Sequence, residues 1–379
     1  ANKSLRNGVV INNRSKNDKE LGSGLSNLAD VVYFPSCKLS NGLIYLLKSR
    51  ILLKDPDPFE EAACNRGLGW ILTAQSCYTA TNGELAADGV LNKAMEYGKK
   101  EEAHSILSTS AHAYTKWALA QVKDKDNGHL LQTEALNWGL KTMGYTDQHR
   151  ISGQINLFIL LNSYEALGRA LIAAIQIKVP LHDITGQVFF YDEHFQKITN
   201  TVVPDISNYS ILAERCVQEG LTLSRRINYL FIECIFSLLS AQLEWQKIVN
   251  KEKEITHFIE VEKFVTDTHS LAERIGYRML LADLHLFCAE VLIELKELNP
   301  GYTKLLKLSA AEHLEKARDY AKDTSTIDDI FLPPDGTADE FYKDIPEYTM
   351  LKRGMTEEER IKKGYYAAWL RADGLEKRL

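Results

Sequence analysis

Apolar residues recur three and four positions apart over most of the chain, which is the spacing of helices with one buried stripe. The helical stretches fall into six pairs, each with a first helix A and a second helix B. The predicted A helices span residues 24–35, 58–77, 102–122, 149–176, 229–248 and 277–297. The predicted B helices span residues 41–53, 84–99, 129–143, 208–227, 255–275 and 304–323. The pattern therefore predicts an all-α protein.

Small residues stand where the helices of such pairs would cross. The segment LSRRINY at 223–229 recurs in similar form as LAERIGY at 271–277, and this offset of 48 residues aligns the helices of one pair with those of the next. The small positions of the A helices are Leu28-Ala29, Leu68-Gly69, Ser110-Ala111, Leu167-Gly168, Ser240-Ala241 and Cys288-Ala289. The B helices carry the triads Gly42-Leu46-Ser49, Ala87-Leu91-Ala94, Ala135-Gly139-Thr142, Ala213-Val217-Gly220, Val261-Val265-Thr268 and Ala310-Leu314-Ala317. Small side chains let A and B approach closely, and the large residue between them fills the gap to the next pair.

These pairs and triads resemble the tetratricopeptide (TPR) repeat. The resemblance covers residues 24–323 and implies a right-handed superhelical α-solenoid of about six TPR-like hairpins. Most of the pairs are longer than the usual repeat of about 34 residues, and the early aromatic of helix A and the terminal Pro are mostly missing. The long repeats are similar to the sensor arrays of bacterial STAND-type signalling ATPases. That similarity implies a neighbouring effector domain in the same chain.

Four segments stand outside the repeat. Residues 1–23 are polar and are expected to form a linker or N-terminal extension, and residues 360–379 a C-terminal capping helix. The insertion at 178–207 is aromatic and β-branched on both sides of a polar turn, which favours a β-hairpin or an ordered loop. Its Phe189 and Tyr191 are candidate partner contacts, although packing on the chain's own helices explains them as well. The insertion at 324–359 is expected to be a loop over the concave face or a flexible connector.

Composition narrows the possible functions. The chain has 379 residues and a net charge of -6, which argues against general nucleic-acid binding. We see no signal-peptide pattern and no apolar run close to the roughly 20 residues that span a bilayer, so we expect a cytoplasmic protein with no membrane partner. The six cysteines include no C-x-x-C spacing and are expected to be scattered, mostly buried thiols.

No motif predicts catalysis, a cofactor or a metal. The sequence has neither a G-x-x-x-x-G-K-[ST] phosphate loop nor an H-E-x-x-H metal spacing. His182 and His194 have acidic neighbours, but turn polarity explains them better than metal binding. Cys288 follows His285 by one helical turn, which allows a nucleophile and its base, yet Cys288 occupies a small-residue packing position.

One basic cluster is a candidate ligand site. Arg225 and Arg226 precede one A helix, and Arg274 and Arg278 stand one repeat later. Equivalent positions of stacked repeats align, so these arginines could hold a peptide carboxylate or a phosphate. Capping of helix C-termini explains Arg226 and Arg274 nearly as well.

The sequence thus predicts a non-catalytic binding or sensor module that holds a peptide or protein segment in a concave face. The alternatives are an adaptor or assembly scaffold without a switching role, and an enzyme with a site in the insertions.

Overall fold

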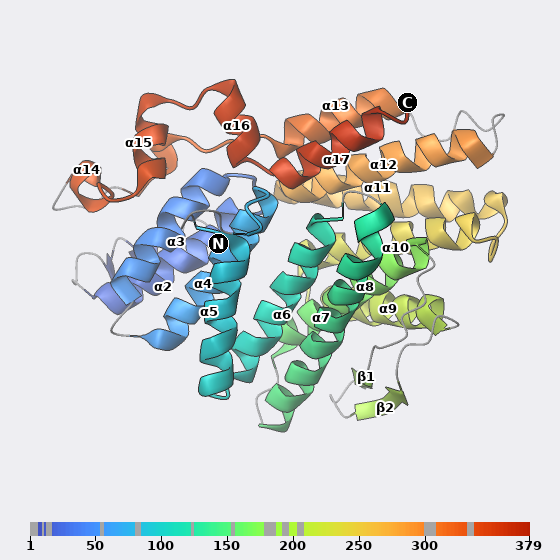
Figure 1. Cartoon of the computed structure of the whole chain (residues 1–379), viewed down its shortest axis with the longest axis horizontal. Coiled ribbons are helices and arrows are strands. Elements are labelled where there is room, and N and C mark those ends of the chain that lie inside the picture. Colours follow the sequence, from blue (N-terminus) through green and yellow to red (C-terminus); the bar gives the residue numbers. More distant parts are fainter. Residues whose placement is uncertain are drawn as a thin grey trace.

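The computed structural model describes residues 7–9, 11–12, 17–53, 57–79, 85–122, 125–152, 156–177, 187–191, 197–202, 208–298, 308–331 and 337–379. Within them the protein is mostly helical, as predicted (Figure 1). The A helices are α2 (Asp18–Leu28), continued by the π-helical turn η1 (Ala29–Tyr33), α4 (Pro58–Ala74), α6 (His104–Ala120), α8 (Leu157–Ile177), α10 (Leu230–Val249) and α12 (Arg278–Leu298). The B helices are α3 (Leu39–Leu53), α5 (Ala87–Lys100), α7 (Lys125–Ile151), α9 (Tyr209–Arg226), α11 (Phe258–Ile275) and α13 (Ala310–Ala321).

Several predicted helix boundaries are wrong, and the B helix predicted at 129–143 spans Lys125–Ile151 (α7). Helix α2 begins at Asp18, inside the expected polar extension, because the Asn17 side chain accepts a hydrogen bond from the Glu20 amide and caps it. The predicted A helix from residue 149 instead starts at Leu157, since 149–151 complete the long helix α7. The Asn156 side chain accepts a hydrogen bond from the Phe158 amide at this later start.

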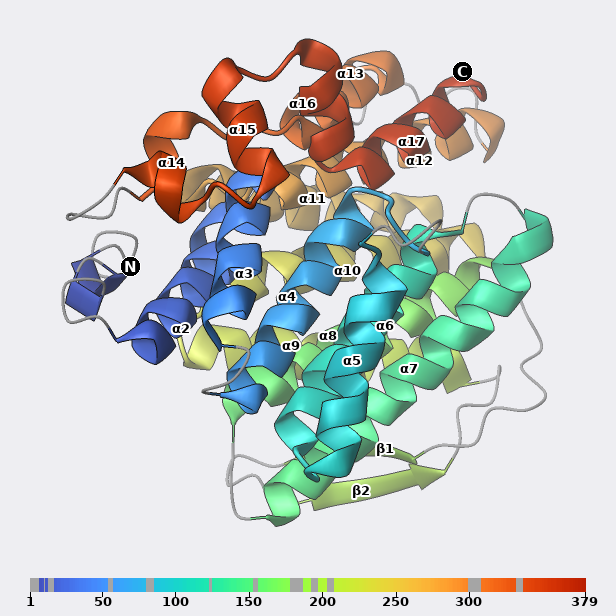
Figure 2. The same cartoon turned by 60° about the vertical axis from the view of Figure 1, so that its left-hand side comes forward.

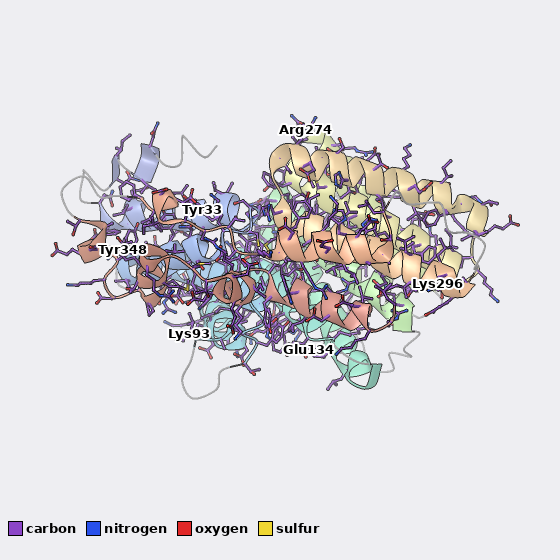
Figure 3. The ribbon with its side chains drawn as sticks, turned by 90° about the horizontal axis from the view of Figure 1, so that it is seen from above. Tyr33, Lys93, Glu134, Arg274, Lys296 and Tyr348 are labelled. Carbon is purple, nitrogen blue, oxygen red and sulfur yellow. The ribbon has the colours of Figure 1, made fainter. Side chains whose placement is uncertain are left out.

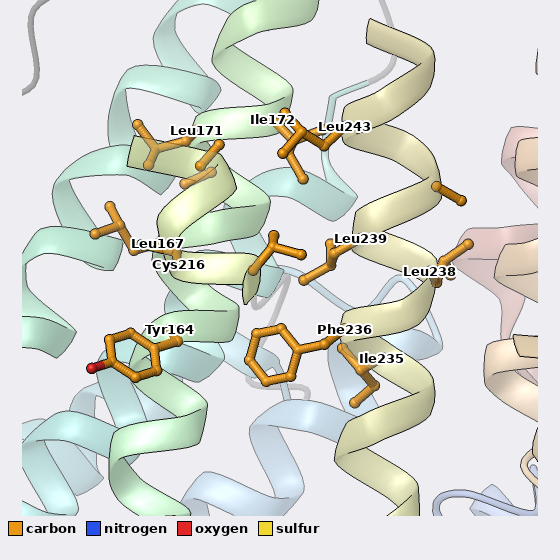
Figure 4. Packing of buried hydrophobic residues seen from close by; sticks show 14 of the residues in the cluster. Tyr164, Leu167, Leu171, Ile172, Cys216, Ile235, Phe236, Leu238, Leu239 and Leu243 are labelled. Carbon is orange, nitrogen blue, oxygen red and sulfur yellow. The ribbon is translucent and has the colours of Figure 1, made fainter. Parts of the chain in front are cut away.

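Each helix packs on the next one along the chain, and successive A helices also contact one another. These second contacts join α4 to α6, α6 to α8, α8 to α10 and α10 to α12. Figure 4 shows side chains of α8, α9 and α10 meeting in one apolar cluster, with Leu167, Cys216 and Phe236 among them. Neighbouring helices from α2 to α13 therefore pack directly on one another.

Two of the predicted small residues, Gly69 and Gly220, lie at close helix crossings. A Cβ added to Gly69 of α4 would lie 2.4 Å from Leu91 of α5, so helices A and B of this pair meet through a glycine. A Cβ added to Gly220 of α9 would lie 2.1 Å from the Phe236 ring of α10, so adjacent pairs also meet through a glycine. Any larger side chain at either position would push the two helices apart.

The insertion at 178–207 contains two antiparallel strands, β1 (Gln187–Tyr191) and β2 (Lys197–Val202), as the hairpin prediction expected. Strand β1 packs on α7, and Phe190 stacks on Tyr164 of α8 with ring centroids 5.9 Å apart. Phe189 and Tyr191 are each only 6% exposed, and the Tyr191 hydroxyl donates to Asp147. Both aromatics are therefore largely covered by the chain itself, and a partner contact at them stays a prediction.

The described part of the segment after α13 consists of short helical elements that pack on the first helix pair. It forms the 3-10 turn η4 (Ile327–Asp329), α14 (Ala338–Phe341) and α15 (Pro346–Arg353), and α15 contacts the B helix α3 (Figure 2). Six of its apolar side chains enter the same buried cluster as α2 and α3; these are Ile330, Ala338, Tyr342, Ile345, Tyr348 and Leu351. Tyr33 and Tyr348 accordingly lie on the same side of the molecule (Figure 3).

The backbone of residues 323–331 is held by the first helix pair. Asn41 and Thr326 exchange two hydrogen bonds, one to the Thr326 carbonyl and one from its amide. The Asp323 carboxylate, 1% exposed, accepts from the Ser40 amide at the start of α3. The hydroxyls of Tyr33 and Tyr45 both donate to the Asp329 carbonyl. This segment therefore joins the end of the array to its beginning.

The expected C-terminal capping helix is divided in two at Gly364. Helix α16 (Glu357–Lys363) ends there and α17 (Tyr366–Glu376) begins just after it. A Cβ at Gly364 would lie 2.3 Å from the Ala321 carbonyl oxygen, so only glycine allows this approach. Helix α17 contacts α4, α12 and α13, and it thereby bridges an early and a late A helix (Figures 1 and 2).

One helix among the described residues, Leu157–Gln176, is apolar and long enough to cross a membrane, contrary to our sequence expectation. It belongs to α8, which packs between α6, α7, α9 and α10, and 83% of it is buried in the protein. Its place at the centre of the array accounts for its apolar character.

Candidate functional site: a charged cluster on the A helices

The four predicted arginines lie at helix ends and do not form a charged cluster of their own. Arg225 and Arg226 are exposed in the last turn of α9, and Arg225 is 2.9 Å from Glu233. Arg274 is exposed in the last turn of α11 and lies at the periphery (Figure 3). Arg278 begins α12, stacks over Tyr320 and donates to the Asp319 carbonyl. The helix dipole favours three of these positions without any ligand, and a ligand role for the set stays a prediction.

A different set of charged side chains meets between α6 and α8. Glu165 is 1% exposed, and its Oε1 lies 2.8 Å from Arg169 Nε and 3.1 Å from Lys116 Nζ. Its Oε2 lies 3.3 Å from His112 Nε2. His112 and Lys116 are one turn apart on α6, and Glu165 and Arg169 are one turn apart on α8, so each helix presents its pair on one face.

The electrostatics of the cluster follow from burial and proximity. Burial alone would raise the pKa of Glu165, but Lys116, His112 and Arg169 together hold it well below its usual value. Burial, aided by the positive charge of Lys116, lowers the pKa of His112 to about 4. At neutral pH the cluster therefore contains one carboxylate, two cations and a neutral imidazole.

Helix α4 extends the cluster on one side. Arg66 pairs with Asp30 of η1 at 2.8 Å, and its guanidinium lies 5.0 Å from the centre of the Trp70 ring. Lys116 Nζ lies 5.6 Å from the same ring. The Trp70 ring also meets His112 edge to face, with ring centroids 5.9 Å apart. Trp70 thus connects the arginine of α4 to the histidine and lysine of α6.

Helices α12 and α17 close the other side. The Tyr365 hydroxyl, just before α17, donates to Asp283 at 3.0 Å, and Arg371 lies 2.7 Å from Glu290. Burial raises the pKa of Asp283 against the opposing effect of Arg169 and Arg371. The charges of α6, α8, α12 and α17 therefore act on one another.

The catalytic alternative finds little support near Cys288. That thiol is 1% exposed, and burial raises its pKa to about 12, which keeps it protonated. His285 Nδ1 is hydrogen-bonded to His313 Nδ1 at 2.8 Å. His182 and His194 lie outside the described residues. In the part of the chain that the structure describes, no three His, Cys, Asp or Glu side chains are placed to hold a metal ion.

Sequence reasoning missed this cluster although a signal was present. Charged residues one turn apart, such as His112 with Lys116 and Glu165 with Arg169, interrupt helices that are otherwise strongly apolar. These positions lie inside the helices, whereas the predicted arginines lie at the helix junctions.

Comparisons with known protein families, with characterised proteins and with solved structures found no match to this chain. The function is therefore inferred from the helix packing and from the charged cluster.

Proposed function

We propose that this protein is a non-catalytic binding module in which six TPR-like helix pairs form a right-handed superhelix and hold a peptide or protein segment against the A helices. The glycine contacts within and between pairs, at Gly69 and Gly220, support the TPR-like packing. The unbroken series of contacts from α4 to α12 supports a stacked array. We also propose a cytoplasmic location, since all six cysteines are free thiols.

The observation that carries the proposal is the charged cluster on consecutive A helices. A buried ion pair is a weak source of stability, because desolvation offsets most of the attraction. Lys116 and Arg169 nevertheless keep side-chain exposures of 30% and 19% beside a fully buried Glu165. Partly exposed cations, fixed in position by a buried carboxylate, are suited to hold polar groups of a guest.

A sensing role is favoured over a passive scaffold by the position of α17. This helix contacts both α4 and α12, and Tyr365 before it is bonded to Asp283 in the charged region. A guest bound to the cluster would touch the segment that joins the two ends of the array. Its binding can therefore change how tightly those ends are held together.

A selection from a random 15-mer phage library against the intact chain tests this proposal. The enriched peptide, made synthetically, is then titrated against the wild type and Lys116→Met by fluorescence anisotropy. We expect Lys116→Met to weaken binding about tenfold or more, since it loses one charge-assisted contact. Lys93→Met, on the exposed face of α5 (Figure 3), is the matched control and should bind within about twofold of the wild type.

Two results would contradict the proposal. One is a library that yields no peptide with saturable binding. The other is a peptide whose affinity falls equally in Lys116→Met and Lys93→Met, because its site would then lie away from the A helices.

A further inference from the structure

Three neighbouring side chains of the cluster have buried polar nitrogens without a hydrogen-bond partner. They are Arg66 Nε, Trp70 Nε1 and both ring nitrogens of His112. Arg66 and Trp70 are one turn apart on α4, and His112 meets the Trp70 ring from α6. A buried donor that lacks an acceptor typically costs about 1–3 kcal/mol. Such groups are rare in native proteins, and several in one place call for an explanation.

The carboxylates nearby do not satisfy all of these nitrogens. Asp30 pairs with an Nη nitrogen of Arg66 and leaves Nε without a partner. Glu165 Oε2 lies 3.3 Å from His112 Nε2, so the single proton of the neutral imidazole faces this carboxylate, and Nδ1 is left as an acceptor without a partner. Trp70 Nε1 can only donate, and so can the guanidinium of Arg66 and the ammonium of Lys116. The region therefore has more donors than acceptors.

Solvent reaches this region. The side chains of Arg66 and Asp30 are 16% and 17% exposed, and Lys116 beside them is 30% exposed. A small molecule could therefore approach donors that are themselves buried. The ring of Trp70, flanked by two cations, would form the apolar wall of such a site.

We propose that Arg66, Trp70 and Lys116 form a binding site for a small oxyanion, a carboxylate or a phosphate. The oxygens of the anion accept hydrogen bonds from Arg66 Nε and Trp70 Nε1. The ammonium of Lys116, 5.6 Å from the centre of the Trp70 ring, adds positive charge beside the anion. This ligand is a small molecule and not the peptide of the proposed function, so either claim can fail while the other stands.

Equilibrium dialysis of the full-length chain with radiolabelled inorganic phosphate or succinate, at constant ionic strength, tests the site. We expect saturable binding of at least one of the two anions, with one anion per chain. Trp70→Phe keeps the ring and removes the donor, and it should weaken binding about ten- to hundredfold. Lys116→Met should weaken it to a similar degree.

The chain contains a matched control pair. Lys141 lies over the ring of Trp138 on α7 at 4.1 Å, but Trp138 Nε1 is already bonded to Glu134. Trp138→Phe and Lys141→Met should bind the anion as the wild type does. Circular dichroism confirms that each variant is folded before dialysis.

The two anions separate the possible sources of the ligand. Binding of phosphate alone identifies a phosphate or phosphoryl ligand, and binding of succinate alone identifies a carboxylate. Binding of neither anion would overturn the proposal and assign water to the donors. Equal weakening by the Trp70 and Trp138 substitutions would overturn it as well, because the affinity would then not depend on the Nε1 donor of Trp70.

Discussion

The contact between Gly220 and Phe236 allows the packing of adjacent helix pairs to be tested by one methyl group. In Gly220→Ala the new Cβ would lie 2.1 Å from Cζ and 2.2 Å from Cε1 of the Phe236 ring. Phe236 is fully buried among α8, α9 and α10 and cannot turn out to solvent. Overpacking of this kind costs about 1–3 kcal/mol, and a rigid aromatic neighbour places Gly220→Ala at the upper end. Alanine recovers about 0.5–1 kcal/mol of helix propensity, so we expect a net loss of about 2 kcal/mol.

Gly89→Ala is the matched control for this prediction. Gly89 is also inside a helix, α5, but a Cβ there would meet no atom within 4 Å. The helix propensity of alanine then acts alone, and Gly89→Ala should stabilise the protein by about 0.5–1 kcal/mol. Urea unfolding followed by far-UV circular dichroism measures both variants against the wild type. Equal stability of the two variants would refute the close approach of α9 and α10.

Three further predictions concern charged and buried groups. Glu165→Gln leaves Lys116 and Arg169 without their carboxylate and should cost about 3–5 kcal/mol of unfolding free energy; a thermal midpoint within about 2 °C of the wild type would contradict it. Burial lowers the pKa of three histidines, to about 4 for His112, about 3 for His285 and about 4 for His313. In the unfolded chain these histidines have a pKa near 6.5, so between about pH 6.5 and 4 the unfolded chain binds more protons than the folded one. The contribution of the neutral histidines to the free energy of unfolding is therefore complete above pH 6.5 and is lost as the pH falls toward 4. The loss should reach about 1.4 kcal/mol per pH unit for each histidine, and urea midpoints that stay constant from pH 6.5 to 5 would exclude it. Asp323→Ala removes the acceptor of the Ser40 amide and should cost about 1–3 kcal/mol; hydrogen exchange at the start of α3 should become faster, while that of α9 should not change.

Local information was enough to place most of the helices. The boundaries of α4, α10 and α12 fall within a few residues of the prediction, because the apolar stripe that defines each helix depends only on residues close together in the sequence. The error at the start of α8 lies where the Asn156 cap decides the boundary. Small-residue positions such as Gly69 were also predictable, since small residues stand at similar places in the other predicted helix pairs.

The residues of the candidate site are visible in the sequence, but their meeting in space is not. The sequence shows charged residues one turn apart at His112 and Lys116 and again at Glu165 and Arg169. It does not show that α6 and α8 turn these faces toward each other, because that depends on how each pair is rotated against the next. The same limit explains why the sequence does not show that Phe189 and Tyr191 enter the buried cluster that contains residues of α7 and α8.

The sequence by itself determined the helices, their pairing and the small residues at their crossings, because these depend on residues near one another along the chain. Only the tertiary structure decided that α17 meets α4 and that residues 323–331 lie on α3. Those contacts join segments nearly 300 residues apart, and they depend on how all the intervening helices pack. No local pattern encodes that arrangement. The charged cluster depends on a nearer contact, since α6 and α8 must turn their charged faces toward each other.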